Sequence, residues 1–182
     1  MSNQVLIDPE IPEQDRRRVA GIFKAVEHRM GFVPAGLRLY AISPPVLEQF
    51  INLVGYFMEH PSLNLKLLVF IRYLVSSAAR CRFCIDFNGA MLLDMGVSEE
   101  ELLTARDQPD RAPLPASDRL LLKIALAAVH DPDDIDQADM AAARQAGFSD
   151  REIFDAVIVA ANNKAFTTVL RTFKVEDQSA FA

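Results

Sequence analysis

Apolar residues recur at the three- and four-residue spacing of an α-helix along most of the chain, and no segment alternates long enough to indicate a strand. Glycine is scarce, at seven residues, so the tight turns of a hairpin-rich fold are poorly supplied. We therefore expect an all-α fold, a single-domain helical bundle. The segments expected to be helical are 12–30, 37–41, 43–60, 62–79, 81–93, 117–129, 136–145 and 150–173, with a further helix after Ser98.

The length of the chain favours one globular domain, because 182 residues fit a single core of ordinary size. We expect residues 1–12 to form an extended N-terminal arm and residues 13–182 to form the helical domain. The segment 62–79 is apolar on almost every face, which is typical of a helix surrounded by its neighbours. We expect it to be the central helix, with Ser62 as its N-cap.

Two segments carry the same signal for the start of a helix. In each, a glycine that stops one helix is followed by an apolar residue and a serine, and a glutamate comes three residues after the serine. The pairs are Ser98 with Glu101 and Ser149 with Glu152, and we expect a capping box at each.

The charge balance argues against nucleic acid as a partner. Nineteen basic and 25 acidic residues give a net charge of −6, whereas polyanion binding needs clustered Lys and Arg. Residues 1–12 lack the basic and then apolar order of a secretory signal. The apolar segment 63–79 contains Lys66 and Arg72 and is shorter than the roughly 20 apolar residues of a membrane span. We expect a cytoplasmic protein without a membrane or nucleic-acid partner.

The only two cysteines, Cys81 and Cys84, form one CxxC motif. A single CxxC does not close a zinc site, which takes four ligands, and no second Cys pair or HxxxH pattern accompanies it. We expect no metal and no other cofactor. Two interpretations remain, a dithiol/disulfide redox pair and two inert buried thiols. Arg80, Arg82 and the N-terminus of the following helix favour the redox pair, because positive charge stabilises a thiolate.

The run 62–95, a long apolar helix followed by the CxxC motif and a second helix, resembles the core of the alkylhydroperoxidase D and carboxymuconolactone decarboxylase family, in particular its peroxidase-related branch. The similarity extends over about residues 18–175. It includes the segments 31–34, 41–44 and 157–161. The resemblance implies an all-helical protein that assembles into homo-oligomers. It also implies a CxxC pair that reduces hydroperoxides and is recycled by a disulfide reductant.

The resemblance also implies a proton relay that this chain lacks. In the family a Glu lies twelve positions before the first Cys and a His lies four positions after the second, and here those positions hold Val69 and Asn88. Asn88 can form a hydrogen bond but cannot usefully accept a proton. Asp86 is the nearest ionisable residue, yet residues two apart on a helix do not face each other. Asn88 and Asp86 are therefore weak site candidates beside Cys81 and Cys84.

The other polar residues give weaker signals. His28, His60 and His130 each lie near the end of an expected helix, and the central helix separates His60 from the cysteines by about 27 Å at roughly 1.5 Å per residue. The acidic run 131–136 lacks the glycine and the final glutamate of a calcium loop, so we expect a helix start there. The three polar residues 162–164 either line a pocket or interface or form an exposed face.

The sequence thus predicts a thiol-dependent peroxidase-like protein in which Cys81 and Cys84 cycle between dithiol and disulfide. Family analogy makes Cys84 the thiol that peroxide attacks, whereas the helix dipole favours Cys81 as the more acidic thiol. The alternative is a catalytically degenerate relative that binds a small molecule or a partner and keeps the CxxC as a structural or vestigial pair. Lactone decarboxylation is supported by the family name alone.

Overall fold

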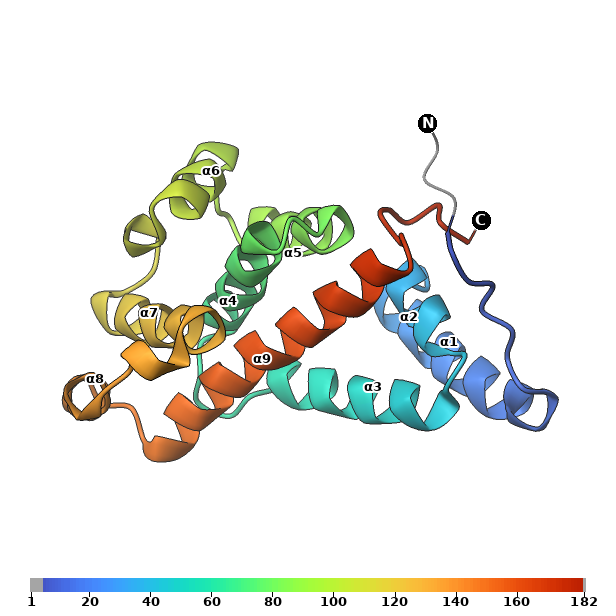
Figure 1. Cartoon of the computed structure of the whole chain (residues 1–182), viewed down its shortest axis with the longest axis horizontal. Coiled ribbons are helices and arrows are strands. Elements are labelled where there is room, and N and C mark those ends of the chain that lie inside the picture. Colours follow the sequence, from blue (N-terminus) through green and yellow to red (C-terminus); the bar gives the residue numbers. More distant parts are fainter. Residues whose placement is uncertain (1–4, 182) are drawn as a thin grey trace. The chain divides into compact units, whose positions relative to one another are not determined.

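The computed structural model describes residues 5–181, and within this range every regular element is a helix (Figure 1). The all-α prediction is confirmed. Among the described residues, contacts cluster into two compact units, residues 5–58 with 169–181, and residues 59–168. Residues 1–4 of the expected arm lie outside the described residues, and residues 5–12 are not helical. The assignment of residues 13–182 to one domain stays a prediction.

The first unit is built from three helices and the C-terminal end of a fourth. Gly31, in the left-handed conformation at φ 79°, ends the first helix, and its N–H donates to the Glu27 carbonyl at 2.7 Å. Arg18 and Glu48 form an ion pair between the first and third helices. The core of this unit consists of Val19, Val26, Leu37, Ala41 and Leu47. The helices are α1 (Arg16–Met30), α2 (Ala35–Tyr40), α3 (Pro44–Met58) and the end of α9 (Asp150–Thr172).

The second unit is organised around one buried helix, α4 (Leu65–Ala78), which packs against α5 and α7 (Figure 1). Residues 67–71 are all buried, so every face of α4 meets protein, as the apolar sequence predicts. The remaining helices of this unit are α5 (Arg82–Asp94), α6 (Glu99–Asp107), α7 (Ala116–His130), α8 (Gln137–Gln145) and most of α9.

The N-cap of α4 is Asn64, so the prediction of Ser62 is wrong. The Asn64 side chain accepts the Lys66 N–H at 2.9 Å. The displacement has a local cause. The imidazole of His60 accepts the backbone N–H groups of Ser62 and Leu63, which holds these residues in a turn and delays the start of the helix.

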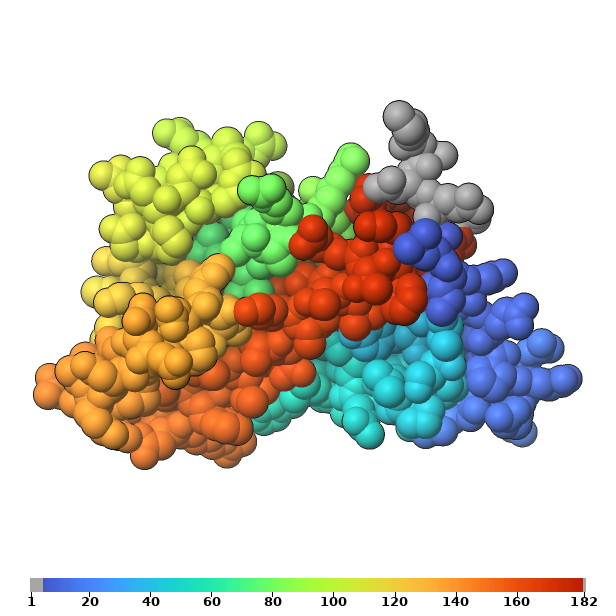
Figure 2. Space-filling model, viewed as in Figure 1, coloured from blue at the N-terminus to red at the C-terminus, as the bar shows by residue number. Residues whose placement is uncertain are grey.

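Both predicted capping boxes are present. The Ser98 and Ser149 hydroxyls accept the N–H groups of Glu101 and Glu152, and each carboxylate accepts the backbone N–H of its serine. Asp136 begins α8 with a third box, so the acidic run ends in a helix start, as expected. Figure 2 shows α6 (yellow-green) and α8 (orange) at the outside of their unit, in line with their many exposed polar residues.

Helix α9 is long and apolar enough to cross a membrane by length and composition alone, with a mean hydropathy of 1.2 over its best window. Half of that window is buried within the protein, and the helix carries the buried polar residues Asp155, Asn163 and Thr167. These features are typical of a core helix. The cytoplasmic location and the absence of a membrane partner stay predictions.

Candidate functional site

The two cysteines lie at a tight corner between α4 and α5. Arg80 adopts the left-handed conformation at φ 52°, and the Cys81 N–H donates to the Ser76 carbonyl at 3.0 Å, so α4 ends in a Schellman motif. A left-handed non-glycine residue costs roughly 1–2 kcal/mol. Cys81 is then the N-cap of α5, and its carbonyl accepts the Ile85 N–H at 2.9 Å. The corner therefore fixes the backbone of Cys81 from both helices.

The thiols of Cys81 and Cys84 face each other inside the protein. Their Sγ atoms are 3.1 Å apart, which is hydrogen-bonding contact between two unbonded thiols. The two residues are 1% and 2% exposed. The structure thus brings together the two residues that the CxxC spacing singled out, in the dithiol form and away from bulk water.

The environment of Cys84 disfavours its thiolate. The hydrogen bond shared with Cys81 raises the pKa of Cys84 well above its ordinary value, and burial raises it further. The Ser76 hydroxyl is within hydrogen-bonding reach of the Cys84 thiol and acts in the opposite direction. Cys84 therefore holds its proton at neutral pH.

A buried set of hydrogen bonds connects α4 and α9 beside the thiols. The Ser76 hydroxyl donates to the Arg72 carbonyl at 2.6 Å, one turn earlier on α4. From α9, the Asn163 side-chain amide donates both to the same carbonyl at 3.0 Å and to the Ser76 oxygen at 2.9 Å. Ser76 and Asn163 are 0% and 8% exposed. The Cys84 thiol is thus next to an ordered polar network.

The Arg72 side chain extends the polar character of this region toward α5. Its Nη2 lies 3.9 Å from the sulfur of Met91. Burial lowers the pKa of Arg72 to about 10, which leaves the guanidinium charged at neutral pH.

Asn88 and Val69, which occupy the two positions of the family's proton relay, do not contact the thiols through a proton-accepting group. The Asn88 amide donates to the carbonyl of Cys84 at 2.8 Å, so its described hydrogen bond goes to the backbone of its own helix. Val69 is completely buried in the α4 core. Neither residue supplies a base to the thiols.

Asp86 and Arg82 lie on the surface of α5. The Arg82 Nε is 3.8 Å from Asp86 Oδ2, and the two side chains are 73% and 66% exposed. The structure does not bring Asp86 into the buried thiol site, and the positive charge expected beside the thiols is partly neutralised by this ion pair.

The histidines lie elsewhere. His60, which comes before α4 while the cysteines follow it, accepts two backbone N–H groups at Nδ1, so its ring proton is on Nε2. Nε2 donates to Asp155 Oδ2 at 3.1 Å, and both side chains are nearly inaccessible. This pair ties the loop before α4 to α9. His28 and His130 are in the last turns of α1 and α7.

The three polar residues 162–164 of α9 have different surroundings, and none of them lines either of the two cavities described below. Asn163 contributes to the buried network, whereas Asn162 donates to the carbonyl of Ile158 within its own helix at 2.9 Å. The Lys164 ammonium donates to the carbonyl of Val129. Sequence reasoning missed Ser76 entirely. The available signal was a pair of serines, Ser76 and Ser77, in a mostly apolar helix, on the turn that precedes the CxxC motif.

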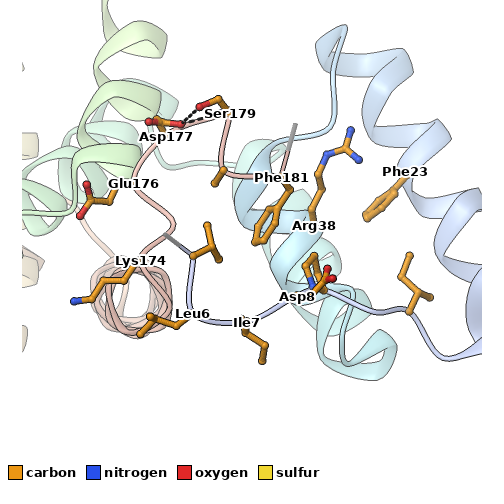
Figure 3. A pocket seen from close by; sticks show the side chains of 14 residues that line it. Leu6, Ile7, Asp8, Phe23, Arg38, Lys174, Glu176, Asp177, Ser179 and Phe181 are labelled. Carbon is orange, nitrogen blue, oxygen red and sulfur yellow. Dashed lines mark hydrogen bonds between the residues drawn. The ribbon is translucent and has the colours of Figure 1, made fainter. Parts of the chain in front are cut away.

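Neither of two cavities in the structure is lined by a cysteine. A cavity of about 950 Å³ in the first unit lies among α1, α2 and both terminal segments. Figure 3 shows Arg38 of this cavity near Phe23. The guanidinium carbon of Arg38 lies 5.9 Å from the centroid of the Phe23 ring. Its lining mixes Arg38 and Lys174 with Asp8, Glu176 and Asp177, so it has no dominant charge. A second cavity, of about 650 Å³, lies in the unit that holds the thiols.

The helical fold and the buried dithiol at the α4–α5 corner define a protein of the alkylhydroperoxidase D type. Residues 44–112 match the model of the carboxymuconolactone decarboxylase family. The predicted resemblance is confirmed. No curated protein sequence matches the chain significantly.

Solved structures with the same fold extend over nearly the whole chain. An uncharacterized peroxidase-related protein from Silicibacter sp. TM1040 is 22% identical, with a TM-score of 0.83 over 95% of this chain and 91% of that one. An uncharacterized peroxidase-related protein with an alkylhydroperoxidase core, from Ralstonia eutropha JMP134, is 20% identical, with a TM-score of 0.80 over 100% and 96%. The debrominase Bmp8, as a cysteine-to-alanine variant in complex with 2,3,4-tribromopyrrole, is 16% identical, with a TM-score of 0.69 over 94% and 90%. At these identities the similarity establishes the fold.

Proposed function

We propose that the protein is a thiol-dependent peroxidase in which Cys81 and Cys84 alternate between dithiol and disulfide. The observation that carries the proposal is the 3.1 Å contact between the two unbonded sulfur atoms at the start of α5. Two thiols already in contact need only a small movement to close a disulfide. The fixed backbone of Cys81 lowers the conformational cost of that closure.

Cys81 is the thiol that reacts first in this proposal. It caps α5, whose N-terminus stabilises negative charge, while Cys84 retains its proton. The Cys81 thiolate attacks one oxygen of the hydroperoxide, so that an S–O bond forms and the O–O bond breaks. The departing alkoxide takes the proton that Cys81 released and leaves as an alcohol. Cys81 is now a sulfenic acid.

Cys84 completes the cycle as the resolving thiol. Its sulfur attacks the sulfur of the Cys81 sulfenic acid, the S–S bond forms, and hydroxide leaves with the Cys84 proton as water. Two electrons from the dithiol have then reduced one hydroperoxide. An external dithiol reductant restores the pair by thiol–disulfide exchange.

Ser76 takes over part of the task of the missing relay. When Cys84 loses its proton, the Ser76 hydroxyl can turn from the Arg72 carbonyl to the Cys84 sulfur, because Asn163 keeps a donor on that carbonyl. Ser76 is not a base, so it stabilises the thiolate without accepting its proton.

The test is to mix the reduced protein with a hydroperoxide and to follow free thiols and peroxide together. We expect thiol loss faster than for a free low-molecular-weight thiol, with one peroxide consumed for each disulfide. Cys84→Ser should abolish the disulfide and leave a Cys81 sulfenic acid that dimedone traps, whereas Cys81→Ser should give little trapped product. Loss no faster than that of the free thiol would contradict the proposal.

A second candidate is a degenerate family member that binds a small molecule or a partner and no longer reduces peroxides. The burial of both thiols, the raised pKa of Cys84 and the absence of the relay favour it. It predicts that the dithiol survives peroxide treatment. The similar protein Bmp8 is a debrominase, so the chemistry of this fold is not limited to peroxides, and halogenated pyrroles belong in the substrate panel.

A further inference from the structure

One face of α7 carries basic residues and lines a cavity of about 650 Å³ in the second unit. Arg119, Lys123 and His130 recur at three- to four-residue spacing or its multiples, so they lie along one side of the helix. The remaining walls of the cavity come from α4, from the end of α6 and from the turn that follows α6. The lining residues that the argument uses are Leu74, Arg106, Arg119, Lys123, Leu126 and Ala127.

The charge at this cavity is the opposite of the charge of the chain. Arg106, Arg119 and Lys123 line it with one carboxylate, Asp110, although the whole protein has a net charge of −6. Among the described residues 5–181, neither Arg119 nor Lys123 takes part in an ion pair. Arg119 donates to the Leu114 carbonyl, which holds its guanidinium in place. Two cations are therefore available to an anionic ligand.

Apart from Ser77 and His130, the rest of the lining is apolar. Leu74 of α4 is 4% exposed and closes the cavity from the core side, and Leu126 and Ala127 of α7 form the adjoining wall. The volume lies within the range of about 300–1,000 Å³ that small-molecule sites occupy. A ligand that fits this cavity needs an anionic head group and an apolar body.

We propose that this cavity binds an amphipathic carboxylate, with the head group near Arg119 and Lys123 and the aliphatic chain against Leu74 and Leu126. Guanidinium and ammonium groups donate charge-assisted hydrogen bonds to a carboxylate, and the leucines remove its chain from water. The site is separate from the thiols, because neither cysteine lines the cavity. The proposal holds whether or not the dithiol reduces peroxides.

The test uses three probes, with binding measured by isothermal titration calorimetry on the full chain. Octanoate carries both the head group and the chain, 1-octanol keeps the chain without the charge, and acetate keeps the charge without the chain. We expect octanoate to bind more tightly than either of the others, and more weakly as ionic strength rises. Equal affinity for octanoate and octanol, equal affinity for octanoate and acetate, or no octanoate binding at millimolar concentration would each overturn the proposal.

Two variants locate the binding. Lys123→Gln should weaken octanoate binding about two- to fivefold, the effect of an exposed charge pair, whereas Lys24→Gln on α1 makes the same charge change outside the cavity and should leave binding unchanged. Ala127→Phe fills the cavity and should abolish binding, with the circular dichroism spectrum and melting temperature checked for folding. Octanoate binding that survives Ala127→Phe in the folded protein would place the ligand elsewhere and refute the proposal.

Discussion

The side-chain amide of Asn163 on α9 donates a 2.9 Å hydrogen bond to the hydroxyl of Ser76 on α4. Its other N–H goes to the Arg72 carbonyl, so both donors of a buried amide are satisfied. This contact connects two helices that are far apart in the sequence and places a hydroxyl next to Cys84. It is the structural support of the thiol site.

Asn163→Ala should destabilise the protein, because it removes both hydrogen bonds between the helices. We expect a loss of about 1–3 kcal/mol in the free energy of unfolding, measured by urea denaturation. Asn162→Ala is the matched control. Asn162 bonds only within its own helix in the described contacts, and its replacement should change stability by about 0.5 kcal/mol or less. If the two variants lose the same free energy of unfolding, the hydrogen bonds of Asn163 to α4 do not stabilise the protein.

Ser76→Ala should make the Cys84 thiolate harder to form. In a Cys81→Ser background, which leaves one thiol, the thiolate fraction at a fixed pH should fall up to about tenfold, as expected for one hydrogen bond to a charged group. Thiolate absorbance near 240 nm against pH measures it, and thiolate absorbance does not depend on reagent access. Ser77→Ala is the control, because Ser77 makes the same kind of bond, to the Tyr73 carbonyl at 2.9 Å. A shift shared by both variants would assign the effect to the helix and not to Ser76.

The local signals of the sequence predicted most of the fold. Ser98, Ser149 and Gly31 act within a few residues of themselves, so their caps and helix ends were predictable. The start of α4 was not predictable from local signals, because it depends on the His60 imidazole accepting the backbone N–H of Leu63 in the turn before the helix. The two cysteines of the CxxC motif are close in the chain and were found from spacing alone. The contact between Ser76 and Asn163 joins residues on different helices, and periodicity carries no information about which helices meet.

His60→Ala should also be costly, although His60 is far along the chain from the thiols. The change leaves the Asp155 carboxylate without its imidazole donor and two backbone N–H groups without their acceptor. We expect a loss of about 1–3 kcal/mol, measured by urea denaturation at pH 7.5. The exposed His130 gives the control, and His130→Ala should change stability by about 0.5 kcal/mol or less. If His60→Ala leaves the free energy of unfolding unchanged, the loop before α4 does not depend on the hydrogen bond between His60 and Asp155.

The capping boxes should make stability decrease in acid. Backbone hydrogen bonds from Ser98 and Ser149 lower the pKa of Glu101 and of Glu152 below the ordinary 4.5. A lowered pKa in the folded state stabilises the protein above pH 4.5, and that stabilisation disappears as the pH falls from 4.5 through the folded-state value. Melting temperatures from pH 6 to 3 measure it. The Glu101→Gln/Glu152→Gln variant keeps the hydrogen-bond acceptors but cannot titrate, so its melting temperature should fall less over this range. If the melting temperatures of the two proteins fall in parallel with pH, the capping boxes do not contribute to the loss of stability in acid.

Asn88→His should speed the closure of the Cys81–Cys84 disulfide if the dithiol is the reactive centre. Position 88 lies one helical turn after Cys84, and the present amide bonds only the Cys84 carbonyl in the described contacts, so an imidazole there would add a proton acceptor on the side of the thiol. General-base catalysis contributes about 10²–10⁴-fold where the geometry is right, and we expect at least about tenfold faster conversion of the Cys81 sulfenic acid into the disulfide after mixing with hydroperoxide. The gain should be greatest above the pKa of the new histidine and should vanish in Asn88→His/Cys84→Ser, while Asn88→Gln, which restores only an amide, should give none. An unchanged rate in a folded Asn88→His variant would indicate that a base is not what limits the reaction, and would favour the degenerate, ligand-binding interpretation of the site.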